Sequence, residues 1–162
     1  MRALIVDDSS FIREYLRHLL STMDIVCEEA VDGSDALTML AAEETFDLML
    51  LDVNMPVMNG LECVKALREA RLGPQMKVMM VTTEADHSFI ATALDNGADE
   101  FLMKPFTPES LREKMLLLGV IAGGTGVARL GFFRDLALIF LWQHGRLGCH
   151  ADRELALRYR LL

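Results

Sequence analysis

The chain has 162 residues, of which 52% are hydrophobic and 25% are charged, and its formal net charge is −8. This composition is typical of a globular protein that can bury a hydrophobic core, and it excludes a disordered or fibrous chain. The acidic balance argues against nucleic-acid binding by the main body of the chain. The three cysteines form no CxxC pair, which indicates reduced thiols in a cytosolic protein.

The charge is distributed unevenly along the chain. Residues 1–118 contain 10 Lys and Arg against 21 Asp and Glu, whereas residues 119–162 contain 6 Arg, no Lys and 3 acidic residues. The two net charges are therefore −11 and +3. This contrast predicts one domain over residues 1–118 and a C-terminal tail of different character over residues 119–162.

The amino-terminal segment "MRALIVDDSS" reaches acidic residues at position 7, so we expect no signal peptide and a cytoplasmic location. Short apolar segments and helical patterns then alternate along residues 1–118. The predicted strands cover residues 3–6, 25–29, 47–51, 77–82 and 100–103. The predicted helices cover residues 9–22, 33–44, 61–71, 88–97 and 108–118. The first helix is expected to present one broad apolar face that includes Phe11, Tyr15 and Leu19.

Five strand–helix repeats predict an α/β fold in which helices cover both faces of a parallel sheet. In such sheets, ligands bind beyond the carboxyl ends of the strands. Polar side chains gather at these predicted ends: Asp7 and Asp8 after the first strand, Asp52 after the third, Thr82 on the fourth and Lys104 after the fifth. Each alone has an ordinary structural explanation, such as a helix cap or a surface charge. Together they indicate a functional site.

The chemistry of this group favours phosphoryl transfer. Three carboxylates brought close together repel one another, and at least one should hold a proton unless a cation lies among them. Oxygen ligands without His or Cys favour a hard ion such as Mg²⁺. A remaining carboxylate can attack phosphorus and form an aspartyl phosphate, and a Lys and a hydroxyl donor would complete the site.

Four segments carry a resemblance to a known family: "LIVDDSSFIR", "LLDVNMPVMNGLE", "VMMVTTEAD" and "GADEFLMKPFTPESL". Over about residues 1–118 the chain resembles the receiver domain of response regulators in two-component systems, and especially the stand-alone chemotaxis type. The resemblance implies a flavodoxin-like (βα)₅ three-layer sandwich with parallel strand order 2-1-3-4-5. It also implies a cis peptide bond between Lys104 and Pro105.

The resemblance also implies roles for individual residues. Asp52 would be the phosphoacceptor, and Lys104 would pair with the phosphoryl oxygens. Mg²⁺ would be held by Asp8, Asp52 and the backbone carbonyl of Asn54, with Asp7 acting through water.

Thr82 and Phe101 would form the conformational switch. Phe101 stands where the family often has a Tyr, so it has no hydroxyl, and plain strand packing is the alternative explanation for it. Asn54 and Glu84 match the chemotaxis type at positions that tune autodephosphorylation, which implies a short-lived phosphoryl state.

The implied function is that of a phosphoacceptor signalling protein in a phosphorelay. A sensor histidine kinase or a histidine phosphotransfer protein would phosphorylate Asp52. The face formed by residues 88–118 would then change and bind a downstream protein target. Such a protein is a regulatory module with phosphoryl-acceptor and autodephosphorylation activity, not a metabolic enzyme. One alternative is the receiver part of a truncated transcription factor or effector. The other is a phosphate-ester hydrolase of the haloacid dehalogenase type, although that type carries a DxD motif where this chain has adjacent acids.

The tail over residues 119–162 holds seven of the eleven glycines. Its apolar run Leu136–Trp142 is shorter than the roughly 20 residues that a bilayer span requires, so we expect no membrane span. The tail matches no phosphate loop, and Cys149 and His150 match no strong zinc pattern. It could be a docking or dimerisation element, a remnant of an output domain or a non-native end.

Overall fold

The computed structural model describes residues 1–42, 45–83 and 87–122, without the side chains of residues 87 and 88. Strands and helices alternate along this part of the chain. The strands are β1 (Arg2–Val6), β2 (Val26–Ala30), β3 (Leu48–Asp52), β4 (Lys77–Thr82) and β5 (Glu100–Met103). The helices are α1 (Ser10–Ser21), α2 (Gly33–Ala41), α3 (Gly60–Glu69), α4 (His87–Asp95) and α5 (Pro108–Leu117). The expectations for the tail beyond residue 122 lie outside the described residues.

The five strands form one parallel sheet in the order β2-β1-β3-β4-β5, as the resemblance implied. Leu50 of the central strand β3 pairs with Ile5 of β1 on one side and with Met79 of β4 on the other. All five residues of β3 are buried, which is expected of a strand covered on both faces.

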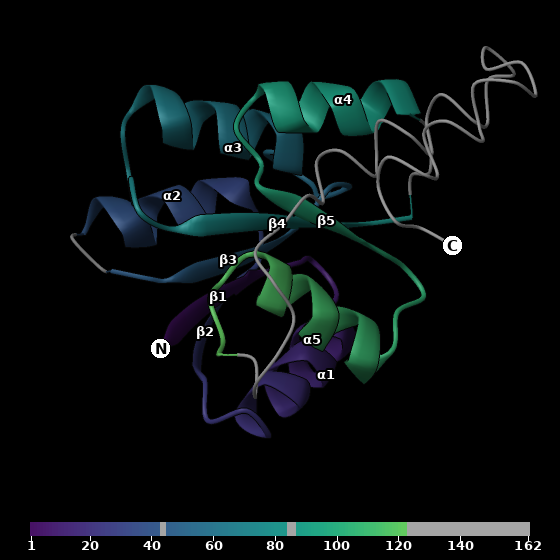
Figure 1. Cartoon of the computed structure of the whole chain (residues 1–162). Coiled ribbons are helices and arrows are strands. Elements are labelled where there is room, and N and C mark those ends of the chain that lie inside the picture. The colour runs from purple at the N-terminus through teal and green to yellow at the C-terminus, as the bar shows by residue number, and fades with distance from the viewer. Residues whose placement is uncertain (43–44, 84–86, 123–162) are drawn as a thin grey trace, which may run out of the picture. The chain divides into compact units, whose positions relative to one another are not determined.

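Helices cover both faces of the sheet, with α1 and α5 on one face and α2, α3 and α4 on the other (Figure 1). Successive strand residues point to opposite faces, so each strand contributes to two hydrophobic clusters. Ile5 and Leu50 pack with α1 and α5, whereas Leu4 and Met49 pack with α2 and α3. The structure therefore confirms the predicted flavodoxin-like three-layer sandwich.

Local sequence signals explain where several helices begin. Asn59 accepts a hydrogen bond from the Glu62 backbone N–H, and the Glu62 carboxylate accepts one from the Asn59 backbone N–H. This reciprocal pair satisfies two backbone donors at the first turn of α3. Thr107 caps α5 in the same manner, and Pro108 occupies the first turn, as its sequence position predicted.

Asp52 lies at the carboxyl end of the central strand, as the sequence predicted, and it is the last residue of β3. One detail of the sequence prediction was wrong. Phe11, which was expected on the buried face of α1, is 73% exposed. It lies in the first turn of α1, and packing of this helix against the sheet begins only at Ile12.

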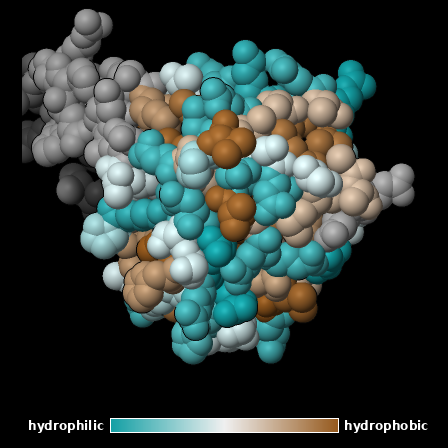
Figure 2. Space-filling model, turned by 180° about the vertical axis from the view of Figure 1, so that it is seen from behind, coloured by the Kyte–Doolittle hydropathy of each residue, from teal (hydrophilic) through white to brown (hydrophobic). Residues whose placement is uncertain are grey.

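On the face shown in Figure 2, the most hydrophobic residues form small separate groups among hydrophilic ones.

Within the part of the chain that the structure describes, none of the helices combines the length and the apolar character needed to cross a membrane.

Candidate functional site

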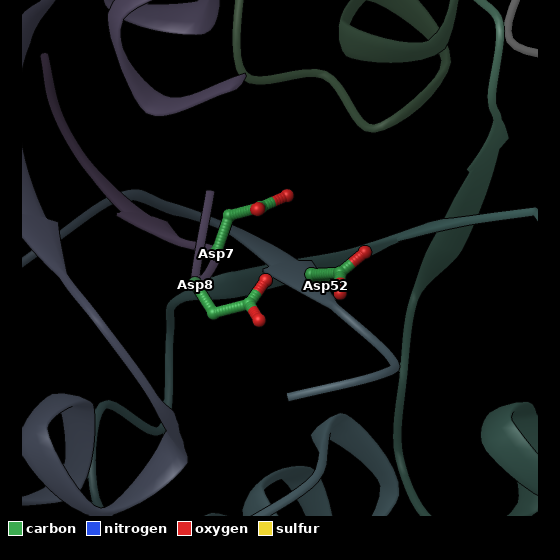
Figure 3. Close-up of side chains that lie close together, drawn as sticks. All are labelled: Asp7, Asp8 and Asp52. Atoms are coloured by element: carbon green, nitrogen blue, oxygen red, sulfur yellow. The ribbon is translucent and has the colours of Figure 1, made fainter. Parts of the chain in front are cut away.

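Three of the predicted acids converge at the carboxyl edge of the sheet (Figure 3). Asp7, Asp8 and Asp52 each offer a carboxylate oxygen, and these oxygens lie within 4.8 Å of one another. Asp7 and Asp52 are 2% and 6% exposed, whereas Asp8 is exposed to solvent. Two buried acids and one accessible acid therefore share one small site.

The parallel register brings the acids together. Val6 pairs with Leu51, so the residues that follow them, Asp7 and Asp52, lie side by side where β1 and β3 end. The Asp7 backbone N–H donates to the carbonyl of Ala30, and its Oδ1 accepts from the Ser9 backbone N–H at 2.9 Å. These bonds hold the Asp7 carboxylate in the turn between β1 and α1.

Lys104 lies between the two buried carboxylates. Its Nζ donates to Asp7 Oδ2 at 2.8 Å and to Asp52 Oδ1 at 2.6 Å. The Lys104 backbone N–H donates to the carbonyl of Thr82 at 2.7 Å, which ties the turn after β5 to the end of β4. The peptide bond between Lys104 and Pro105 is cis, as the resemblance implied.

Burial and neighbouring charges act differently on the pKa values of Asp52 and Lys104. Burial raises the pKa of the Asp52 carboxyl above its ordinary value, and the charge of Asp7 adds to this, against the opposing effect of Lys104. Burial lowers the pKa of the Lys104 ammonium, but hydrogen bonds to Asp52 and Asp7 outweigh it, so this pKa is raised overall. Lys104 therefore stays charged, while the site still holds an excess of negative groups.

The backbone around Asp52 is closely packed. Asp52 Oδ2 accepts from the Asn54 backbone N–H at 3.1 Å. Gly60 begins α3 so near to this strand that a Cβ atom there would lie 2.3 Å from the carbonyl oxygen of Asp52. Only a glycine at position 60 allows this approach, which sets the position of the Asp52 main chain.

Thr82 and Phe101 lie on β4 and β5, the two strands beyond β3 in the sheet. Thr82 is 1% exposed and ends β4, one residue beyond Val81, the partner of Asp52. Phe101 is half-buried on β5, and both residues line a recess between α4 and the sheet. The structure thus brings Asp7, Asp8, Asp52, Thr82 and Lys104 to the carboxyl edge of the sheet, with the Asn54 backbone beside Asp52. Phe101 lies further into the sheet, where it pairs with Met80, and Glu84 lies outside the described residues.

The acid cluster fits a hard divalent cation. It supplies oxygen donors only, and of its three carboxylates those of Asp7 and Asp52 bind the one ammonium group of Lys104. In the described ranges, no other group of three His, Cys, Asp or Glu side chains is close enough to hold a metal ion. A Mg²⁺ ion prefers such oxygen donors and would reduce the repulsion among the acids.

Sequence reasoning missed Arg13 as a part of this site. Its Nη1 donates to the backbone carbonyl of Asp7 at 2.7 Å, and its Nε donates to Glu29 at 3.0 Å. Arg13 therefore connects α1 and β2 to the turn that carries the acids. No pattern in the sequence marks a side chain that bonds to a main-chain carbonyl.

Comparison with known proteins agrees with this geometry. The model of the response regulator receiver domain family matches residues 3–116. The chain belongs to this family. Receiver domains are regulatory modules of two-component systems, which confirms the coarse function that the sequence implied.

Individual relatives support the same assignment. The chemotaxis protein CheY homolog of Campylobacter jejuni is 39% identical over 129 residues, covering 78% of this chain and 96% of that protein. Response regulator MprA of Mycobacterium avium is 40% identical over 118 residues, covering 73% of this chain and 50% of that protein. The solved structure of chemotaxis protein CheY4 of Vibrio cholerae has a TM-score of 0.66 and 38% identity, covering 74% of this chain and 98% of that one. This receiver domain is therefore CheY-like.

Proposed function

We propose that this receiver domain accepts a phosphoryl group on Asp52 from a phosphohistidine of a sensor histidine kinase or a histidine phosphotransfer protein. The observation that carries the proposal is the position of Lys104, whose Nζ bridges Asp7 and Asp52 within a three-carboxylate cluster. In a member of the receiver family, this arrangement supplies a nucleophile and a cation at the same place.

The transfer step needs few protein groups. A carboxylate oxygen of Asp52 forms a bond to phosphorus, and the phosphorus–nitrogen bond of the phosphohistidine breaks. The electron pair of that bond stays on the imidazole nitrogen, and the ring leaves neutral when its other nitrogen carries a proton. Lys104 then neutralises part of the charge on the phosphoryl oxygens, and positioning together with such electrostatic stabilisation accounts for most of the catalysis of phosphoryl transfer.

Asp8, Asp52 and the carbonyl of Asn54 would hold Mg²⁺, with Asp7 contributing through water. When bound, Mg²⁺ supplies positive charge to the phosphoryl oxygens. The residues of the chain do the remaining work. Asp7 orients Lys104 through its hydrogen bond, Gly60 keeps the Asp52 main chain in place, and the accessible Asp8 leaves the site open to a donor.

Thr82 and Phe101 would form the switch that reports the phosphoryl group to the face of α4, β5 and α5, where a downstream protein would bind. Autodephosphorylation would return the domain to rest, with Asn54 beside the site and Glu84 as the second tuning position. These events would take place in the cytoplasm. A covalently attached output domain is the alternative to a separate target, and the coverage of only half of the MprA relative keeps it open.

Incubation with acetyl phosphate, a small phosphoryl donor, tests the function directly. With Mg²⁺ present, the intact protein should gain the mass of one phosphoryl group, and hydroxylamine should remove it because an acyl phosphate is labile to that reagent. Excess EDTA should abolish the gain. A protein that gains no mass from acetyl phosphate or from any histidine kinase tested would contradict the proposal.

A further inference from the structure

We propose that Glu100 and Lys114 together hold Phe101 in its resting position and thereby set the equilibrium of the switch. The inference rests on the proposed function, because it concerns the regulation of the same site. Neither Glu100 nor Lys114 has a role in the phosphoryl-transfer site described above. Three contacts support the inference. The Glu100 carboxylate accepts two hydrogen bonds, and the Lys114 ammonium faces the Phe101 ring.

The first two contacts anchor Glu100. This residue begins the edge strand β5 and is only 7% exposed. Its Oε1 accepts from the backbone N–H of Phe101 at 2.9 Å and from Lys114 Nζ at 3.1 Å. A buried carboxylate with a charged partner and a backbone donor is held strongly in place. The main chain at Phe101 is therefore tied to α5 through Glu100.

The third contact acts on the aromatic ring. Lys114 Nζ lies 4.9 Å from the centroid of the Phe101 ring, which is within the range of a cation–π interaction. The same ammonium thus binds the Glu100 carboxylate and faces the Phe101 ring. Because Glu100 fixes the ammonium, the ring is attracted to a cation that has a defined position.

The Phe101 ring also borders a small recess beside α4. Thr82 and Met80 line the same recess, which is partly open to solvent. The ring is therefore in contact with Lys114 and also close to the recess that Thr82 lines. A Phe ring has no hydroxyl group, so a hydrogen bond cannot select either position, and the contact with Lys114 becomes the main directional interaction.

Removing the cation should move the ring toward the recess. A cation–π contact at a partly exposed site corresponds to about a two- to five-fold change in an equilibrium. We therefore expect the population of Phe101 rings that point into the recess to rise by about this factor relative to the population in the resting position.

The test uses the double variant Glu100→Gln/Lys114→Met. It removes both charges together, so no buried carboxylate is left without its partner, and the amide oxygen introduced at position 100 can still accept from the Phe101 backbone N–H. Lys114→Arg is the conservative variant, because a guanidinium keeps both the ion pair and the ring contact. Lys65→Met is the matched control, because Lys65 is an exposed lysine on α3.

The readout is the ε-methyl NMR resonance of Met80, recorded on the full chain without any phosphoryl donor. Phe101→Leu supplies the resonance position in the absence of a ring. The resonance in the double variant should move further from this reference than in the wild type, while Lys114→Arg and Lys65→Met should match the wild type. A Met80 resonance that is the same in the double variant and the wild type would overturn the inference.

Phosphorylation by acetyl phosphate separates this inference from the proposed function. If the wild type is phosphorylated but Met80 does not respond to the double substitution, the role of Lys114 is wrong and the function stands. If Met80 responds but none of the variants or the wild type accepts a phosphoryl group, the role of Lys114 stands and the function is wrong.

Discussion

Two charged clusters, one at each edge of the sheet, contain acids and cations in opposite proportions. At the carboxyl edge, one ammonium, Lys104, lies between the carboxylates of Asp7 and Asp52. At the amino edge, one carboxylate, Asp99, lies between the cations of Arg68 and Lys77. The proportion of acids to cations distinguishes a reactive site from a structural anchor in this protein.

Asp99, Arg68 and Lys77 in the cluster at the amino edge all have hydrogen-bond partners within the chain. Asp99 accepts from Lys77 Nζ, from Arg68 Nη2 and from the Val78 backbone N–H, each at 2.9 Å. Arg68 also donates to the carbonyl of Gly97 through its Nε and Nη2 atoms. This network joins α3, β4 and the turn before β5. Its groups have partners within the chain, so it has little capacity to bind a ligand.

The cluster at the carboxyl edge has more negative than positive groups. Asp7 and Asp52 share the ammonium of Lys104, Asp8 lies beside them, and burial together with the charge of Asp7 raises the pKa of Asp52. A site with this imbalance is stabilised by a further cation. Substitutions at the two edges should therefore differ in their effects, and the reaction rate should show the largest difference.

Replacing the lysine at each edge should have very different consequences. Lys104→Met removes the cation beside the nucleophile, so phosphorylation by acetyl phosphate should slow by about 100-fold or more. Lys77→Met is the matched control, because Asp99 keeps Arg68 and the Val78 N–H. Its rate should stay within about two-fold of the wild type, since a half-exposed ion pair contributes about 0–1 kcal/mol. Equal phosphorylation rates in Lys104→Met and Lys77→Met would show that the lysines at the two edges do not differ in their roles.

Replacing the acid at each edge should change stability in opposite directions. Asp99→Asn leaves Arg68 and Lys77 without their anion, and the free energy of unfolding should fall by about 1–3 kcal/mol. Asp52→Asn removes a carboxylate whose pKa is higher in the folded chain than in the unfolded one. The folded chain binds more protons between those two pKa values, so the ionised Asp52 lowers stability above that window.

Asp52→Asn should therefore be more stable than the wild type at neutral pH without metal. The advantage should disappear as the pH falls below about 4, where the carboxyl is protonated in both states. Urea unfolding in EDTA across this pH range measures both effects. A lower free energy of unfolding in Asp52→Asn than in the wild type at neutral pH would show that the ionised Asp52 carboxylate does not destabilise the folded chain.

Magnesium should stabilise the carboxyl edge. At a Mg²⁺ concentration ten times its dissociation constant, the free energy of unfolding should rise by about 1.4 kcal/mol. Asp8→Asn should weaken this response, because Asp8 is the accessible acid of the cluster. Glu69→Gln removes an exposed acid elsewhere and should leave the response unchanged. Thermal unfolding at increasing Mg²⁺ provides the measurement, and an unchanged response in Asp8→Asn would exclude this residue as a ligand.

Relief of backbone strain at Val57 should have the smallest effect on stability. Val57 follows the Asp52 strand, is 85% exposed and has a φ of 66°, a left-handed conformation that disfavours β-branched side chains. Val57→Asn should therefore raise the free energy of unfolding by about 1 kcal/mol. The control Val31→Asn, at an exposed residue without this conformation, should change stability by less than about 0.5 kcal/mol. Equal effects in urea unfolding would show that the strain is absent.

Much of this fold could be predicted because its signals are local. The apolar run before Asp52 predicted a buried central strand, and polar residues after several strands predicted the edge where the site lies. Pro108 predicted the start of α5. These features depend on residues that are close together in the sequence.

Other features depend on contacts that leave no local pattern. Arg13 bonds to a backbone carbonyl, and Glu100 and Lys114 meet only because α5 packs beside β5. Phe11 satisfied the helical period but lies in the first turn, where the period does not reveal which residues reach the sheet. The excess of acid over cation at the carboxyl edge could likewise be seen only once the strands were aligned.

We propose that Asp52, among the three acids of the cluster, receives the phosphoryl group. The most direct measurement treats the phosphorylated protein with borohydride, which reduces an aspartyl phosphate to homoserine, and locates the homoserine by tandem mass spectrometry. If Asp52 is the phosphoacceptor, homoserine should appear at position 52 alone, and none should appear in Asp52→Asn carried through the same reaction. Homoserine at Asp7 or Asp8, or a phosphoryl group that survives reduction on another side chain, would contradict it.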